Sequence, residues 1–251
     1  MRNTLIGLLA LAAAVLPAST HAQEWYTGAS SGSGKTNPDF GVSIDASVAG
    51  TSQGALHVSA FGTIAPFAPM NETGVRMRIG GLIGSYKYVS TAPGVGSVIG
   101  RETAGTLLGG YEWVMPTMTV SVFAGLDIQN RTLSKADPNN TVVGAAVGLK
   151  TALDFYTNPT PYTMVSGNFT YSTNNSAYYA RIKAGMAVVG RVFIGPEMLF
   201  LGDNFYGQWR FGAHVTGIKM GALQFGLSGG YVSDRKNGAG AYTILDAQIR
   251  F

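Results

Sequence analysis

The run MTVSVFAGLDIQ at residues 118–129 decides the fold, because apolar and polar side chains alternate through it with a period of two. Apolar side chains fall at every even position from Met118 to Ile128, whereas Ser121, Asp127 and Gln129 fall on the other face. Successive side chains of a β-strand point to opposite faces of its sheet. The run therefore predicts a strand with one apolar and one polar face.

The same alternation recurs along nearly the whole chain from Phe40 to Phe251. It appears at residues 40–48, 56–60, 75–83, 102–114, 118–129, 143–150, 165–171, 178–186, 194–200, 209–215, 223–231 and 245–251. One such segment is a weak signal, but a chain made almost entirely of them is typical of a membrane barrel. We predict an all-β fold: a transmembrane up-and-down antiparallel β-barrel of about twelve strands, spanning 40–251.

Composition favours this barrel over a soluble β-sandwich or a lipocalin-like cup. Charged residues make up 12% of the chain, about half of the roughly 25% found in soluble domains. The polar faces are rich in Gly, Ser and Gln, which suits a lumen better than a solvated surface. The chain also ends in Phe251 after apolar residues at every second position, which resembles the terminal signature by which outer-membrane barrels are recognised for assembly.

The first residues have the pattern of a signal peptide. Arg2 supplies the positive charge, 5–16 is an apolar run, and Thr20 and Ala22 provide small residues for cleavage. The apolar run is too short for the alternative, a membrane-anchoring helix, which needs about 20 residues. We predict a signal peptide at 1–22 cleaved after Ala22, a flexible segment at 23–39, and secretion to the bacterial outer membrane.

The connections differ in length. Tight links are predicted at 116–117, 189–191 and 219–221, and longer polar links at 89–100, 131–140 and 234–240. The two classes alternate as periplasmic turns and external loops do. The link at 63–73 departs from this pattern, because it is long and holds two prolines on the side where turns are short.

An enzymatic site has little support in the sequence. His57 and Ser59 share a strand face, and lipid A deacylases carry a similar His-x-Ser pair. Here Ala60 and Phe61 follow in place of the Asn-Ala of those enzymes, and no acid to orient the histidine is apparent. A polar pair lining the lumen is the favoured interpretation, and we predict no catalytic residue.

No metal, cofactor or nucleic acid is predicted as a ligand. The chain has no cysteine and three histidines, which give no ligand cluster. Without Arg2, 16 basic residues remain against 13 acidic ones, an excess too small and too dispersed for nucleic acid.

The lumen face carries the candidate binding residues. They are charged, tyrosine or histidine side chains placed inward by parity, namely Arg76, Arg78, Tyr86, Asp127, Lys150, Tyr162, Arg181, Lys183, Glu197, Arg210, His214 and Tyr242. Two roles stay open for the charges: pairing to fill the barrel, or lining a solute pathway. The same parity predicts that Ile182 and Phe211 face lipid.

Several short motifs resemble one known family. Gly195-Pro196-Glu197, the run 209–216, Gly109-Gly110-Tyr111-Glu112, the run 124–127 and Gly229-Gly230-Tyr231 occur in the order seen in the cellulose biosynthesis protein BcsS family. The resemblance covers most of the chain after residue 100 and implies a secreted barrel encoded with a bacterial cellulose synthase system, with no catalytic residue.

From this resemblance we expect a non-enzymatic barrel that aids glucan export or assembly of the export apparatus. Its expected partners are outer-membrane lipid, β-glucan (cellulose) and cellulose synthase components. A general small porin or adhesin-like barrel is the alternative. A lipid-modifying hydrolase is a distant third.

Overall fold

The computed structural model describes residues 41–251. The predicted signal peptide at 1–22, its cleavage after Ala22 and the segment at 23–39 lie outside the described residues. Within 41–251, no helix is long and apolar enough to cross a membrane.

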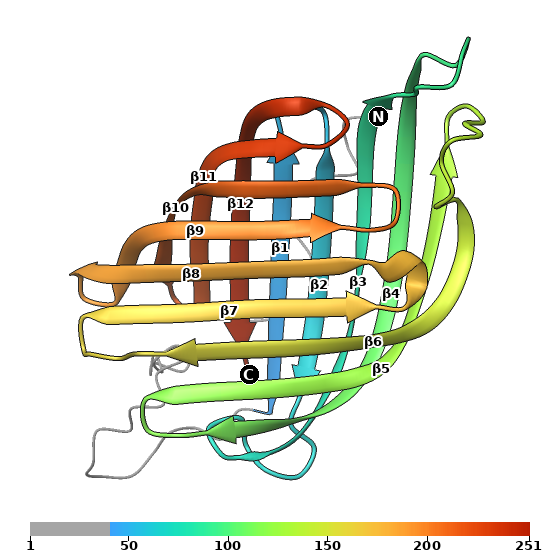
Figure 1. Ribbon diagram of the computed structural model, residues 1–251. Coiled ribbons are helices and arrows are strands. Elements are labelled where there is room, and N and C mark those ends of the chain that lie inside the picture. The colour runs from blue at the N-terminus through green and yellow to red at the C-terminus, as the bar shows by residue number, and fades with distance from the viewer. Residues whose placement is uncertain (1–40) are drawn as a thin grey trace.

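Twelve antiparallel strands form a single closed sheet in which each strand pairs with its neighbours in sequence (Figure 1). The strands are β1 (Val42–Thr51), β2 (Leu56–Ile64), β3 (Gly74–Val89), β4 (Ser97–Val114), β5 (Met118–Leu133), β6 (Gly144–Thr157), β7 (Thr163–Ser172), β8 (Tyr178–Val189), β9 (Val192–Gly202), β10 (Gly207–Met220), β11 (Leu223–Asp234) and β12 (Gly238–Arg250). A short 3-10 helix, η1 (Asn174–Ser176), lies between β7 and β8.

The pairing of β1 with β12 closes the barrel. It runs without a register shift from Ser43 opposite Arg250 to Thr51 opposite Tyr242. An open sheet leaves two edge strands with unpaired N–H and C=O groups, and closure removes both edges. The prediction of an up-and-down antiparallel barrel of about twelve strands is confirmed.

Because the strands alternate in direction, the connections gather at two ends of the barrel. We call one the loop end; it carries the connections 52–55, 90–96, 134–143, 173–177, 203–206 and 235–237. We call the other the terminal end, because β1 begins and β12 ends there.

Successive side chains alternate between the lumen and the outer face, as the period-two pattern predicted. Ile182 and Phe211 point outward and are 43% and 50% exposed. Their neighbours point inward: the Lys183 side chain is 12% exposed and Arg210 is 3% exposed. The inward and outward facing predicted for these four residues is confirmed, and contact of the outer face with lipid stays a prediction.

The predicted long link at 234–240 is wrong. β11 runs to Asp234 and β12 begins at Gly238, so only 235–237 connect them. The Asp234 carboxylate accepts the N–H groups of Lys236 at 2.7 Å and Asn237 at 3.1 Å. Gly238 adopts a φ of +76°, which glycine takes without steric cost. The polar composition of residues 234–240 resembles that of a long loop, but here these residues form the end of one strand, a tight turn and the start of the next strand.

The long link between β2 and β3 is held in place by Arg76. The Arg76 Nη2 group donates to the carbonyls of Pro69, at 3.3 Å, and Glu72. Its Nε group is ion-paired with Glu112 on β4 at 3.0 Å. Met70 and Asn71 line the internal cavity. Part of the connection therefore reaches the lumen at the terminal end, which accounts for a length that joining two neighbouring strands does not require.

Cysteine labelling tests the facing, since the chain has no native cysteine. In the folded protein in lipid, a small water-soluble thiosulfonate should modify Thr170→Cys, which lines the cavity. It should not modify Ile182→Cys, which faces lipid. Heat-denatured samples of both variants should react equally, as the control. Reaction at 182 but not at 170 in the folded state would contradict the assigned faces.

Candidate functional site

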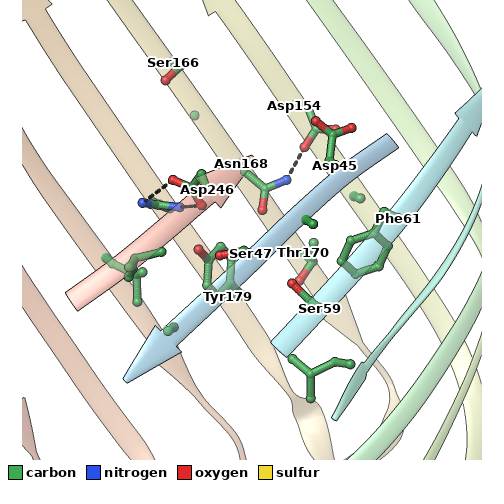
Figure 2. A pocket seen from close by; sticks show the side chains of 18 of the residues that line it. Asp45, Ser47, Ser59, Phe61, Asp154, Ser166, Asn168, Thr170, Tyr179 and Asp246 are labelled. Carbon is green, nitrogen blue, oxygen red and sulfur yellow. Dashed lines mark hydrogen bonds and ion pairs between the residues drawn. The ribbon is translucent and has the colours of Figure 1, made fainter. Parts of the chain in front are cut away.

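The barrel encloses a cavity of about 1460 Å³, larger than the roughly 300–1,000 Å³ of a small-molecule pocket. Polar side chains enter it from opposite walls (Figure 2). Those labelled on β1 and β2 are Asp45, Ser47, Ser59 and Phe61, and those on β7 and β8 are Ser166, Asn168, Thr170 and Tyr179. Hydroxyl, amide and aromatic groups thus share the wall of one internal volume.

A four-membered charge cluster joins side chains of β8, β9 and β12 inside the barrel. Arg181 Nη2 lies 2.7 Å from Glu197 Oε2 and 3.0 Å from Asp246 Oδ2. Lys183 Nζ lies 2.9 Å from Asp246 Oδ2 and 3.7 Å from Glu197 Oε2. Two cations and two anions therefore neutralise one another inside the barrel.

Neutral hydrogen bonds complete the environment of Glu197, which is 1% exposed. Ser228 Oγ donates to its Oε2 atom at 2.8 Å, and Tyr242 OH donates to its Oε1 atom at 3.0 Å. A buried carboxylate is tolerated only when its oxygens are paired and hydrogen-bonded. Glu197 meets that condition and is the centre of the cluster.

A second buried carboxylate, Asp127 on β5, is satisfied in the same way. Lys150 Nζ lies 3.2 Å from its Oδ1 atom. The Oδ2 atom accepts from Ser172 at 2.5 Å, Gln129 at 2.7 Å and Asn174 at 3.2 Å. Asn174 belongs to η1, so this carboxylate fastens the β7–β8 connection to the inner wall.

Further ion pairs cross the interior. Arg78 on β3 reaches Asp154 on β6 at 2.6 Å, with β4 and β5 between them in the sheet. Arg131 on β5 pairs with Glu102 on β4 at 3.1 Å and with Asp203 in the β9–β10 connection. These contacts pass through the interior and narrow it.

An aromatic cap covers part of the loop end; we define it as Tyr88, Val98, Val142 and Phe205. Phe205 comes from the β9–β10 connection, yet its ring meets that of Tyr88 on β3 at 5.3 Å in an edge-to-face geometry. Because Asp203 in the same connection is paired with Arg131, the β9–β10 connection is tied to the opposite wall. The cap restricts the cavity at this end.

Polar contacts above the cap hold the β5–β6 connection. Tyr88 OH donates to Asp137 Oδ2 at 2.8 Å and accepts from Asn140 at 3.0 Å. Burial acts to raise the pKa of Asp137, but hydrogen bonds from Ser90, Tyr88 and the Asn139 N–H outweigh it and lower that pKa below its usual range. Asp137 is thus an anion that organises the turn.

Arg210 on β10 differs from the cations above. Its Nε group donates to Gln208 at 2.6 Å, and its guanidinium lies 5.4 Å from the centre of the Tyr242 ring. Among residues 41–251, no carboxylate oxygen lies within 4.0 Å of it. Arg210 is an inward cation held by a neutral amide and a ring.

His214 stabilises the sheet beside Pro196, the proline that lies within a described strand. Pairing of β8 with β9 breaks between Lys183–Glu197 and Met186–Ile194, where the register would set Ala184 opposite Pro196, which has no N–H to donate. His214 Nε2 lies 3.0 Å from the Ala184 carbonyl oxygen and Nδ1 lies 2.9 Å from Thr216 Oγ1. A carbonyl only accepts, so Nε2 carries the proton and replaces the missing backbone donor.

All the residues predicted from sequence to face the lumen do so except Tyr162. Tyr162 lies in the 158–162 connection and is 71% exposed, because parity is lost where the strand ends. The structure brings Arg181, Lys183 and Glu197 together and separates them from Asp127 and Lys150. A binding role for any of these residues stays a prediction.

Sequence reasoning missed several residues that shape the interior. Asp154 and Arg131 lie four positions beyond Lys150 and Asp127 on the same faces, so continued parity would have found them. Asp203 and Phe205 lie in a connection, where no periodicity exists to place them inside. Their inward position follows from contacts with distant strands.

His57 and Ser59 both line the cavity, as predicted. Within the described part of the chain no hydrogen bond joins them, and Glu102, the carboxylate that interacts with His57, is engaged by Arg131. The described residues also hold no group of three or more His, Cys, Asp or Glu placed to bind a metal ion.

Comparisons with known proteins give a family and distant structural likenesses. The model of a family described as cellulose biosynthesis protein BcsS matches residues 20–251. The sequence matches none of the curated proteins. Among solved structures, the chain is similar to KdgM porin, with 8% identity, a TM-score of 0.44 and coverage of 83% of this chain and 99% of that one.

Two more solved structures share the same level of likeness. The KdgM porin in complex with disordered oligogalacturonate has 8% identity and a TM-score of 0.45, with coverage of 83% of this chain and 99% of that one. The transport unit of the autotransporter AIDA-I from Escherichia coli has 8% identity and a TM-score of 0.45, with coverage of 84% and 88%. Identities this low carry no information on function.

Removing Glu197 should destabilise the barrel more than removing an exposed carboxylate. Glu197→Ala leaves Arg181 and Lys183 with one anion between them inside the lumen, which should cost about 3–5 kcal/mol. Urea unfolding in lipid vesicles, followed by tryptophan fluorescence, measures this. Glu72→Ala, at an exposed position of the β2–β3 connection, should change stability by less than about 0.5 kcal/mol. Equal changes in the free energy of unfolding for the two variants would contradict a stabilising role of the charge cluster.

Proposed function

The chain belongs to the cellulose biosynthesis protein BcsS family, and from this premise we propose that it is a non-enzymatic β-barrel of the bacterial outer membrane that holds or passes a glucan chain during cellulose export. The observation that carries the proposal is the internal cavity, whose charges are largely paired and whose remaining wall combines hydroxyl, amide and aromatic groups with aliphatic side chains such as Leu82, Leu199 and Ile244.

The outer face of the barrel supports the membrane location. Large apolar side chains such as Ile79, Leu107 and Leu126 are at least half exposed there. Aromatic pairs stand at both ends of this face: Tyr111 and Trp113, 5.0 Å apart, near the terminal end, and Trp209 and Tyr231, 5.4 Å apart, near the loop end. Two aromatic girdles around an apolar band are typical of outer-membrane barrels. Delivery by a signal peptide cleaved after Ala22 is part of this proposal.

The lumen chemistry favours a neutral sugar. Asn168, Thr170 and Tyr179 line one wall (Figure 2). A glucose ring has a weakly apolar C–H face that stacks on a tyrosine ring, while amides and hydroxyls donate to and accept from its hydroxyls. Charges that satisfy one another, as Arg181 and Asp246 do, do not demand a charged ligand. A twelve-strand barrel is also wider than the eight-strand size that side chains fill.

In the described conformation the aromatic cap would help to retain a glucan chain in the lumen. Phe205 packs on Tyr88 at the loop end, so a chain that leaves by this end requires the β9–β10 connection to move. A barrel that stays capped would act instead by docking or assembling other cellulose synthase components. Holding or passing a glucan chain requires free space in the lumen, whereas docking other components does not. Variants that fill the lumen therefore distinguish the two roles.

Deletion of the gene in a cellulose-producing strain should lower extracellular cellulose. Synthase activity in isolated inner membranes should be unchanged, because the barrel acts after polymerisation. Cellulose is measured as acid-resistant glucan per cell. Unchanged cellulose output after deletion would contradict the proposed function.

A pair of neighbouring substitutions on β2 separates a glucan-holding lumen from a docking role. Ser59→Trp places a large side chain in the cavity, whereas Ala60→Trp places it on the exposed outer face. If glucan occupies the lumen, only Ala60→Trp should restore cellulose output to the deletion strain. Equal restoration by both variants, at equal amounts of folded protein, would favour docking and contradict occupancy.

A further inference from the structure

Arg210 is the feature of the lumen that the proposed function does not use. Six other inward cations, namely Arg76, Arg78, Arg131, Lys150, Arg181 and Lys183, each lie within 4.0 Å of a carboxylate. Arg250 also lines the cavity, and its Nε group donates to Gln248 Oε1 at 3.1 Å. Arg210 faces no carboxylate among residues 41–251, although it is 3% exposed. It lines the cavity, so its charge is accessible from the inside of the barrel alone.

The guanidinium is oriented but not saturated. Of its five N–H donors, the Nε group donates to Gln208 Oε1 at 2.6 Å. Gln208 is itself fixed, since its amide nitrogen donates to Tyr206 OH at 2.7 Å. The Tyr242 ring packs at 5.4 Å on the guanidinium, and Tyr242 is held by its bond to Glu197. The terminal nitrogens have no partner in the described part of the chain.

An unpaired cation away from bulk water is unfavourable unless a counter-charge or water reaches it. A guanidinium held by its Nε group and by a ring presents its terminal nitrogens as a planar fork, which matches a carboxylate or a phosphate. Tyr179 and Tyr206 line the same cavity. Tyr179 packs against the cluster that contains Tyr242, and Tyr206 is joined to Arg210 through Gln208 while its own hydroxyl donates to Asp234 at 2.6 Å. Tyrosine rings are groups on which a sugar stacks.

We propose that Arg210, with Tyr179 and Tyr206, forms an anion subsite in the lumen that binds the carboxylate or phosphate group of a substituted saccharide. This goes beyond the proposed function, which needs a neutral glucan only. A neutral chain would pass the subsite through hydroxyl contacts, whereas a chain or oligosaccharide bearing an anionic group would be retained there.

The test compares sugars that differ at one position. Full-length protein folded in lipid nanodiscs is titrated calorimetrically with glucose, glucuronate and glucose 6-phosphate. Glucuronate and glucose 6-phosphate should bind at least about tenfold more tightly than glucose, and added salt should weaken both. Arg210→Gln should abolish this preference, and Arg210→Lys, which keeps the charge but not the fork, should retain part of it.

The matched control is Arg101→Gln, which makes the same charge change at an exposed position of β4. It should leave the preference intact. Heat-dependent gel mobility verifies folding of each variant; if Arg210→Gln does not fold, Arg210→Lys and the salt dependence carry the test.

Three results would overturn the subsite. They are equal affinity of wild-type protein for glucose and glucuronate, a preference that survives Arg210→Gln, and inorganic phosphate binding as tightly as glucose 6-phosphate, which would mean a simple ion site. Cellohexaose is titrated into the same samples. Its affinity should not depend on Arg210, so that failure of the subsite and failure of the neutral-glucan proposal are distinguishable.

Discussion

The backbone hydrogen bonds between β1 and β12 are the constraint on which the rest of the structure depends. In the hydrocarbon of a membrane no water satisfies an edge strand, so the ladder must close on itself. Closure from Ser43–Arg250 to Thr51–Tyr242 divides every strand into an outward-facing and a lumen-facing side. All charge carried by the strand interiors must then be accommodated in one internal volume, where it is either paired or bound to something that enters.

Most of that charge is paired, and the pairs also set the shape of the interior. Arg78 and Asp154 join β3 to β6, and Arg131 reaches the β9–β10 connection. Such contacts stabilise the barrel and at the same time occupy part of its interior. The aromatic cap at the loop end and the β2–β3 connection held by Arg76 at the terminal end also restrict the interior. Arg210 has no carboxylate within 4.0 Å among residues 41–251, and for that reason we infer that it binds an anionic ligand.

The period-two pattern was enough to predict the strand number, the antiparallel closed sheet and the facing of residues such as Ile182 and Lys183. Those properties are local, since each strand carries its own alternation. The pairing of charges was not predictable, because Arg181 meets Asp246 from a strand 65 positions away and only closure brings them together. Tyr162 was misplaced because alternation ends with the strand. His214 was predicted as a lumen residue, but its role depends on Pro196, which lies on the neighbouring strand and withholds a donor.

We propose that the lumen, and not the outer surface or the turns, holds the glucan. NMR spectra of the protein in nanodiscs, titrated with cellohexaose and with isotope labels in aromatic, isoleucine and asparagine side chains, test this directly. Shift changes are expected at Tyr179 and Asn168 in the lumen, and none at the outward Ile182 and Phe211. Spectra without changes in the lumen, or with changes confined to the turns of the loop end, would contradict it.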